Sequence, residues 1–255
     1  MKGKRGRHNR YARFSVMAIV SGILLHISGP AALCDDFQDW DRGADGYPYA
    51  LSEAREDEKP LVLYFHQDDC AWSRKMNERY LAAGAVRQFL QAVPCVEVNP
   101  DRDADDEALC KAYGIRDYPA FLVLMPAFDT KPQRIHPFGP DGEMTVAEFL
   151  GALRQWIVNQ YHVKGHAGYE AGQYERTLRH YERALQYDAE NVYTYHALGV
   201  TYQAVFTREE DPDLLQRAEE CYRKALKLDP GHKASKEGLE ALGRWRKAKG
   251  LPPSP

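Results

Sequence analysis

Cys70 is the residue of this sequence best placed for thiol chemistry. It stands where an apolar, strand-like run gives way to a helical segment. The thiolate is the reactive form of cysteine, and the unpaired N–H groups and positive dipole end at the start of a helix favour that anion. Arg74 and Lys75 add positive charge in the next turn, whereas Asp68 and Asp69 oppose it. The sequence leaves the net direction open.

Ser73 occupies the position three residues after Cys70, where a second cysteine would complete a Cys-x-x-Cys pair. A hydroxyl cannot form a disulfide, so dithiol oxidoreduction within this site is excluded. Exchange through a mixed disulfide stays open if an outside thiol, such as glutathione or a second substrate cysteine, resolves it. Ser73 could also donate a hydrogen bond to the Cys70 thiolate.

The elements that must position Cys70 alternate between strands and helices. From residue 61 the predicted order is β, α, β, α, β, β, α, and a short amphipathic helix over 49–58 precedes it. We predict strands at 61–66, 93–98, 121–124 and 133–138, helices at 71–80, 82–91 and 104–113, and a long last helix that opens with the capping box at 145–148.

From about residue 49 to 160 the chain resembles the thioredoxin superfamily. The resemblance is carried by KPLVLYF (59–65), Cys70 with its following RKM, VEVNPDRD (96–103) and KAYGIRDYPAFLVL (111–124). It implies an α/β thioredoxin-like sandwich with a cis Tyr118–Pro119 bond beside Cys70, where an extended peptide can pair with the backbone. The predicted site residues are Cys70, Ser73 and Pro119.

Two further positions depart from the pattern of the redox-active family members. Tyr64 stands six residues before Cys70, where thioredoxin carries a buried acid used in proton transfer. A tyrosine, with an ordinary pKa near 10, is a poor base at neutral pH. Ala120 replaces the threonine that commonly follows the cis-proline. These departures favour a protein that keeps the peptide-docking edge even if the redox chemistry is lost.

The remaining thiols and histidines are weaker candidates. Cys95 lies in a predicted strand and Cys110 on the apolar side of a predicted helix, so we interpret both as buried, inert thiols. A Cys95–Cys110 disulfide is the alternative. His162 and His166 stand four residues apart, but two ligands without a third make a poor metal site. We expect neither a metal nor a cofactor.

The C-terminal part of the sequence repeats itself. YERALQYD (181–188) aligns with YRKALKLD (222–229), and Tyr161 and Gly165 align with Tyr195 and Gly199 at a separation of 34, the period of the tetratricopeptide repeat. A polar insertion at 206–213 lengthens the second repeat. We predict an all-α tetratricopeptide helical array, closed by a capping helix over 233–249, whose tyrosines could line a ligand groove.

The first 34 residues have the composition of a secretory signal peptide. Six basic residues and no acid precede an apolar segment at 14–27 and the small residues of GPAALC at 29–34. An uncleaved membrane anchor is the alternative. Loss of residues 1–34 would take the formal charge from −3 to −9, which argues against a nucleic-acid partner. Export implies an oxidising compartment.

The predicted organisation is a signal peptide (1–34), a thioredoxin-like domain (35–157) and tetratricopeptide repeats with a capping helix (158–249). One hypothesis is a periplasmic or extracellular monothiol protein that docks protein or peptide partners through its repeat groove and the cis-proline edge. Its Cys70 would exchange disulfides. The other is a non-catalytic peptide-binding scaffold with a vestigial redox site.

Overall fold

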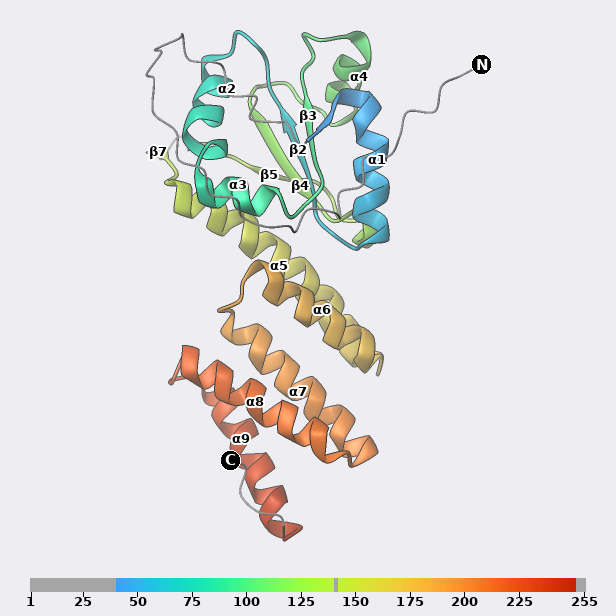
Figure 1. Cartoon of the computed structure of the whole chain (residues 1–255), viewed down its shortest axis with the longest axis vertical. Coiled ribbons are helices and arrows are strands. Elements are labelled where there is room, and N and C mark those ends of the chain that lie inside the picture. The colour runs from blue at the N-terminus through green and yellow to red at the C-terminus, as the bar shows by residue number, and fades with distance from the viewer. Residues whose placement is uncertain (1–39, 140–141, 251–255) are drawn as a thin grey trace, which may run out of the picture. The chain divides into compact units, whose positions relative to one another are not determined.

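The computed structural model describes residues 40–139 and 142–250, so the predicted signal peptide lies outside the described residues (Figure 1). The N-terminal part is built on a five-stranded sheet in the order β1-β3-β2-β4-β5. Strands β1, β3 and β2 run parallel; β4 is antiparallel to β2, and β5 is antiparallel to β4. The strands are β1 (Asp41–Arg42), β2 (Leu61–Phe65), β3 (Cys95–Val98), β4 (Ala120–Leu124) and β5 (Gln133–Ile135).

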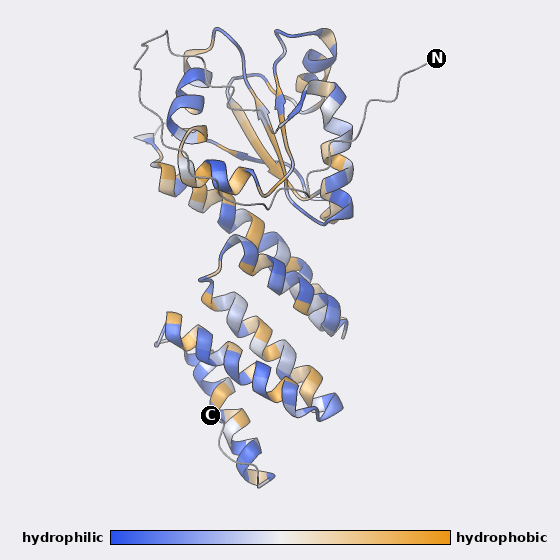
Figure 2. Cartoon of the chain, in the orientation of Figure 1, coloured by the Kyte–Doolittle hydropathy of each residue, from blue (hydrophilic) through white to orange (hydrophobic). Residues whose placement is uncertain are grey.

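Helices cover both faces of this sheet, and this explains why β2 and β4 are apolar throughout rather than alternating. On one face, Val62 and Tyr64 of β2 pack with residues of α2, α3 and α5; on the other, Leu61, Leu63 and Phe65 pack with α1 and α4. Figure 2 shows these central strands as hydrophobic. The helices are α1 (Gly43–Glu56), α2 (Ala71–Met76), α3 (Gly84–Leu90), α4 (Ala104–Ala112) and α5 (Val146–Glu170).

Three elements differ from the sequence prediction in length or type. Helix α1 begins at Gly43, six residues earlier than expected. The predicted helix over 71–80 passes from α2 into a π-helical turn, η1 (Asn77–Leu81), in which the Ala82 N–H donates to the Asn77 carbonyl. The predicted strand over 133–138 stops at Ile135, because Pro137 has no N–H to continue the ladder.

Phe138, which falls within that predicted strand, lies instead in a separate two-stranded hairpin formed by β6 (Phe138–Gly139) and β7 (Gly142–Glu143). A short 3-10 helix, η2 (Pro126–Phe128), follows β4. Among the described residues, no helix is both long enough and apolar enough to cross a membrane.

Helix α5 connects the sheet to the helical array. It opens with the predicted capping box, in which Thr145 and Glu148 satisfy each other's backbone N–H groups. Phe149 and Leu153 in its first half pack in the core of the sheet, whereas Gly165 in its second half lies against α6. The expected domain boundary between residues 157 and 158 therefore falls within one continuous helix.

The helical array continues through α6 (Tyr174–Tyr187), α7 (Val192–Glu209), α8 (Pro212–Leu228) and α9 (Lys233–Ala248). The repeat is visible in its packing: a Cβ on Gly165 would lie 2.5 Å from the ring of Tyr181, and one on Gly199 would lie 2.6 Å from the ring of Tyr222. Each pair is a glycine that lets a tyrosine of the next helix approach. The insertion at 206–213 is less of a loop than expected, because α7 extends through it to Glu209.

Candidate functional site around Cys70

Cys70 is the N-cap residue of α2 and is partly exposed. Its Sγ accepts a hydrogen bond from the Ser73 backbone N–H at 3.4 Å and donates one to the Tyr118 carbonyl at 3.5 Å. The sulfur is the acceptor in the first bond, whereas the second bond requires the proton of the thiol. The Tyr118–Pro119 peptide bond is cis. Because the sulfur contacts both the Ser73 N–H and the carbonyl of the residue before Pro119, the predicted site residues Cys70, Ser73 and Pro119 lie at one corner of the fold.

The hydroxyl of Ser73 has a different partner from the one we expected. The residue is 2% exposed, and its Oγ accepts a hydrogen bond from the Gln67 N–H at 3.4 Å. The sulfur is therefore contacted by the backbone of Ser73 rather than by its side chain. The hydroxyl thereby contacts the turn that precedes Cys70.

Tyr64 is buried directly beneath this turn. Its hydroxyl, which has a single proton to donate, lies 2.7 Å from Asn77 Oδ1 and 3.3 Å from the Ser73 carbonyl. Burial, together with the nearby Cys70 and Glu97, raises the pKa of the Tyr64 hydroxyl far above its usual range. The hydroxyl therefore stays protonated at any physiological pH and stabilises α2 instead of moving a proton.

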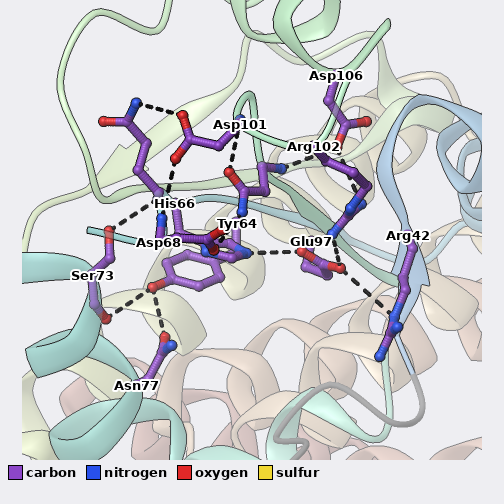
Figure 3. Close-up of polar contacts among 12 residues, drawn as sticks. Arg42, Tyr64, His66, Asp68, Ser73, Asn77, Glu97, Asp101, Arg102 and Asp106 are labelled. Atoms are coloured by element: carbon purple, nitrogen blue, oxygen red, sulfur yellow. Dashed lines mark hydrogen bonds and ion pairs between the residues drawn. The ribbon is translucent and has the colours of Figure 1, made fainter. Parts of the chain in front are cut away.

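An ionic cluster centred on the buried Glu97, absent from the sequence prediction, lies beside Tyr64 (Figure 3). Glu97 of β3 is opposite Tyr64 in the sheet register, and its Oε2 lies 2.8 Å from Nε2 of His66, whose ring stacks on Tyr64 with centroids 5.2 Å apart. Arg102 donates to Glu97 Oε1 at 2.5 Å. Burial alone would raise the pKa of Glu97, but the His66 hydrogen bond and the Arg102 charge outweigh it and hold that pKa below its ordinary value.

One signal in the sequence could have located this cluster. Glu97 interrupts an otherwise apolar strand, and a charged residue at a buried strand position needs a partner. The cluster continues through Asp106, which accepts hydrogen bonds from Arg102 and from the backbone N–H groups of Ala44 and Asn99. It thereby connects the start of α1, the end of β3 and α4.

Two of the charged residues around Cys70, Asp68 and Lys75, have partners away from the sulfur. Asp68 Oδ1 accepts a hydrogen bond from Asn99 at 2.7 Å. Lys75 pairs with Glu143 of the hairpin, and its Nζ lies 5.2 Å from the ring centroid of Trp72. Trp72 is 50% exposed and its ring lies 5.0 Å from that of Phe138. An apolar, tryptophan-centred surface is therefore presented two residues from the sulfur.

The predicted alternative of a Cys95–Cys110 disulfide is wrong. Both thiols are free and buried, and they belong to core clusters on opposite faces of the sheet. Burial raises the pKa of Cys110, and it raises the pKa of Cys221 in the helical array to about 12. Cys110 and Cys221 are therefore poor nucleophiles at neutral pH.

The two histidines weighed as metal ligands have other partners. His162 Nε2 lies 2.7 Å from Thr194 Oγ1, and His166 Nδ1 lies 3.6 Å from Glu170 Oε1 on the same helix. Within residues 40–139 and 142–250, no group of three or more His, Cys, Asp or Glu side chains is arranged to hold a metal ion.

Comparisons with known proteins bear on both parts of the chain. Residues 165–205 match the family model of the TPR repeat. Among solved structures, the chain is similar to a thioredoxin from Thermus thermophilus, with 26% identity, a TM-score of 0.39, and coverage of 48% of this chain and 91% of that one. It is also similar to DsbH oxidoreductase (23% identity, TM-score 0.38, 53% and 93% covered).

A third similar structure is the reduced C-terminal domain of DsbD from Neisseria meningitidis, with 21% identity, a TM-score of 0.36, and coverage of 44% of this chain and 94% of that one. No curated protein matches the chain. The described residues form an α/β part with a mixed five-stranded sheet, followed by the helices α5 to α9, in which residues 165–205 match the TPR repeat. The predicted fold class, an α/β domain followed by an all-α helical array, is confirmed.

Proposed function

We propose that this protein is an exported monothiol exchange protein, which captures cysteine-containing protein partners through Cys70 and holds them through its tetratricopeptide repeats. The observation that carries the proposal is the environment of Cys70. Its partly exposed sulfur lies at the start of a helix and beside the Tyr118 carbonyl, and Ser73 takes the place of a resolving thiol. Repeats of this kind generally mediate contacts between proteins, which supports the second half of the proposal.

The exchange step needs no other group than the two sulfurs of a partner disulfide. The Cys70 thiolate attacks one of them, a new S–S bond forms, and the second partner sulfur leaves as a thiolate. Ser73 cannot displace the partner. Release requires a thiolate from outside the site, either glutathione or a further partner cysteine, which attacks the partner's sulfur and returns Cys70 as a thiolate.

The test is recovery of partners from cells with the native protein and with Cys70→Ala, followed by non-reducing electrophoresis. We expect adducts with the native protein that disappear on reduction and are lost in Cys70→Ala. Cys221→Ala is the matched control, because Cys221 is also partly exposed but has a raised pKa, and its adduct pattern should equal that of the native protein. Absence of any Cys70-dependent adduct would contradict the exchange function.

A second candidate function is a peptide-binding scaffold without redox chemistry. It is supported by Ser73 at the second thiol position and by Tyr64 at the position of the proton-transferring acid. On this function, Cys70→Ala leaves partner recovery unchanged. A substitution in the repeats, such as alanine for Tyr193, whose side chain is 69% exposed, would reduce recovery instead.

Export is supported by the basic and apolar composition of residues 1–34 and by the acidic remainder of the chain. Intact mass spectrometry of the protein purified from cells tests it. We expect a mass that corresponds to cleavage after Ala31 or Cys34. A full-length protein found only in the membrane fraction would instead support the uncleaved anchor.

A further inference from the structure

Arg134 of β5 is bound almost entirely to the segment that faces Cys70. Its two terminal nitrogens donate to the two carboxylate oxygens of Asp117 at 3.0 and 2.7 Å. One of them also reaches the Asp117 carbonyl at 3.1 Å and the Pro119 carbonyl at 3.4 Å. Within the described residues the Nε of Arg134 is buried without a partner, so every side-chain hydrogen bond of this arginine goes to Asp117 or Pro119.

The carbonyl between these two held carbonyls is that of Tyr118, which accepts the hydrogen bond from Cys70 Sγ. Arg134 therefore grips the backbone on both sides of the atom that contacts the sulfur. A guanidinium can do this because its planar fork presents several donors in fixed directions, whereas a lysine ammonium cannot match a carboxylate and two carbonyls at once. The hydrogen bond from Arg134 holds the pKa of Asp117 below its ordinary value, so the pair stays charged.

We propose that Arg134 is a positioning residue that sets the reactivity of Cys70 by holding the Tyr118 carbonyl against the sulfur. The carbonyl accepts only from the protonated thiol, so this contact opposes ionisation, while the Ser73 N–H supports it. Arg134 thereby makes the Cys70 thiol less reactive than a cysteine at the start of α2 would be without the Tyr118 contact. The inference rests on the proposed function only in taking Cys70 as the reactive group.

Charge alone does not produce this effect, because Arg134 and Asp117 form a pair with no net charge. The double variant Arg134→Gln with Asp117→Asn removes the pair and leaves the net charge unchanged. The matched control is Glu107→Gln with Lys111→Gln, which removes an exposed ion pair of 2.6 Å on α4. That pair makes no hydrogen bond to the Asp117–Pro119 segment among the described residues.

The experiment measures the rate of Cys70 alkylation by iodoacetamide against pH, with peptide mapping to separate the thiols. The rate at neutral pH is divided by the plateau rate at high pH, which corrects for differences in the accessibility of the sulfur. We expect this ratio to be about two- to fivefold higher in the double variant than in the native protein, because the loss of one weak hydrogen bond corresponds to a change of this size. The control should match the native protein. A ratio that is unchanged or lower in the double variant would overturn the proposal.

Buried Cys95 serves as the internal check on folding, since it stays unlabelled in a folded variant. If the double variant does not fold, Arg134→Lys replaces it, because it retains the charge but loses the fork. We expect a smaller rise in the same direction, and no rise would equally overturn the proposal. This experiment measures alkylation of Cys70 and does not involve partner proteins. Its result therefore tests the role of Arg134 independently of whether Cys70 exchanges disulfides with partners.

Discussion

The two ends of strand β2 are held in different ways. At its start, the Glu58 carbonyl accepts a hydrogen bond from the Tyr161 hydroxyl at 2.7 Å, and the Asp57 carbonyl accepts one from Arg183. Both donors belong to the helical array. At its end, the chain reaches Cys70, whose sulfur has two hydrogen bonds of 3.4 and 3.5 Å and remains partly exposed.

The segment before β2 is thus anchored to helices, whereas the segment after β2 carries the candidate reactive thiol. The segment before β2 is held by the buried Tyr161 of α5 and the partly exposed Arg183 of α6, and Ala184 of α6 belongs to the same core cluster as the sheet residues. Residues of α7, α8 and α9 pack in a separate cluster. The segment after β2 carries the Cys70 sulfur, which has only two long hydrogen bonds among those described. The ionic cluster around Glu97 lies beside Tyr64, beneath this segment. Helices α5 and α6 therefore stabilise the segment that leads into the strand before Cys70.

Removal of the Tyr161 side chain should have the largest effect on this comparison. Tyr161 is fully buried, and its ring contacts those of Phe128 and Tyr187. We expect Tyr161→Ala to lower the free energy of unfolding by about 3–5 kcal/mol. Tyr161→Phe, which keeps the ring and removes the hydroxyl with its bond to the Glu58 carbonyl, should cost about 1 kcal/mol. Denaturant titration measures both, and equal costs would show that the hydroxyl rather than the packing anchors β2.

Glu97→Gln should have the next largest effect, because it weakens the cluster at the other end of β2. We expect a loss of about 1–2 kcal/mol near pH 7, since the hydrogen bonds to His66 and Arg102 lose their charge. The folded pKa of Glu97 lies below its ordinary value of 4.5, so this stabilisation is present above pH 4.5 and is lost as the pH falls through the folded value. Denaturation at pH 7 and pH 3 tests it. A gap between native and variant that persists at pH 3 would contradict the prediction.

His180 should give a smaller, pH-dependent effect at the start of β2. Burial lowers its pKa, the charges of Arg176, Arg179 and Arg183 add to this, and Glu58, at 3.9 Å, opposes it. Because the unfolded chain takes up the proton more readily, stability should fall as the pH drops below about 6.5.

His180→Gln removes this contribution. We expect the variant to lose less stability than the native protein between pH 7 and pH 5, as measured by thermal unfolding. Equal losses in the two proteins would show that His180 does not carry the acid sensitivity of this junction.

The sequence predicted those features that depend on local pattern. The strands over 61–66 and 121–124 were visible as continuous apolar runs, the capping box at 145–148 as four adjacent residues, and the repeat as a fixed separation of 34. The corner formed by Cys70, Ser73 and Pro119 followed from a family resemblance. These signals need no knowledge of which distant residues meet.

The features that the sequence did not predict depend on contacts between residues far apart in the chain. Helix α1 starts at Gly43 because the carboxylate of Asp106, 62 residues away from Ala44, accepts the Ala44 N–H at 2.7 Å. Arg134 grips the Asp117–Pro119 segment only because β5 pairs with β4 in one register. The Ser73 hydroxyl faces Gln67 rather than the sulfur because the turn before α2 curls over it.

The most direct test of the account is the fate of a mixed disulfide at Cys70. The native protein and Ser73→Cys are each reacted with a peptide disulfide, and the adducts are followed by intact mass spectrometry without added thiol. We expect the native Cys70 adduct to form and to persist until glutathione is supplied. In Ser73→Cys the introduced thiol displaces the peptide and leaves an internal disulfide with Cys70. Failure of the native protein to form the adduct, or its release without any thiol, would contradict the account.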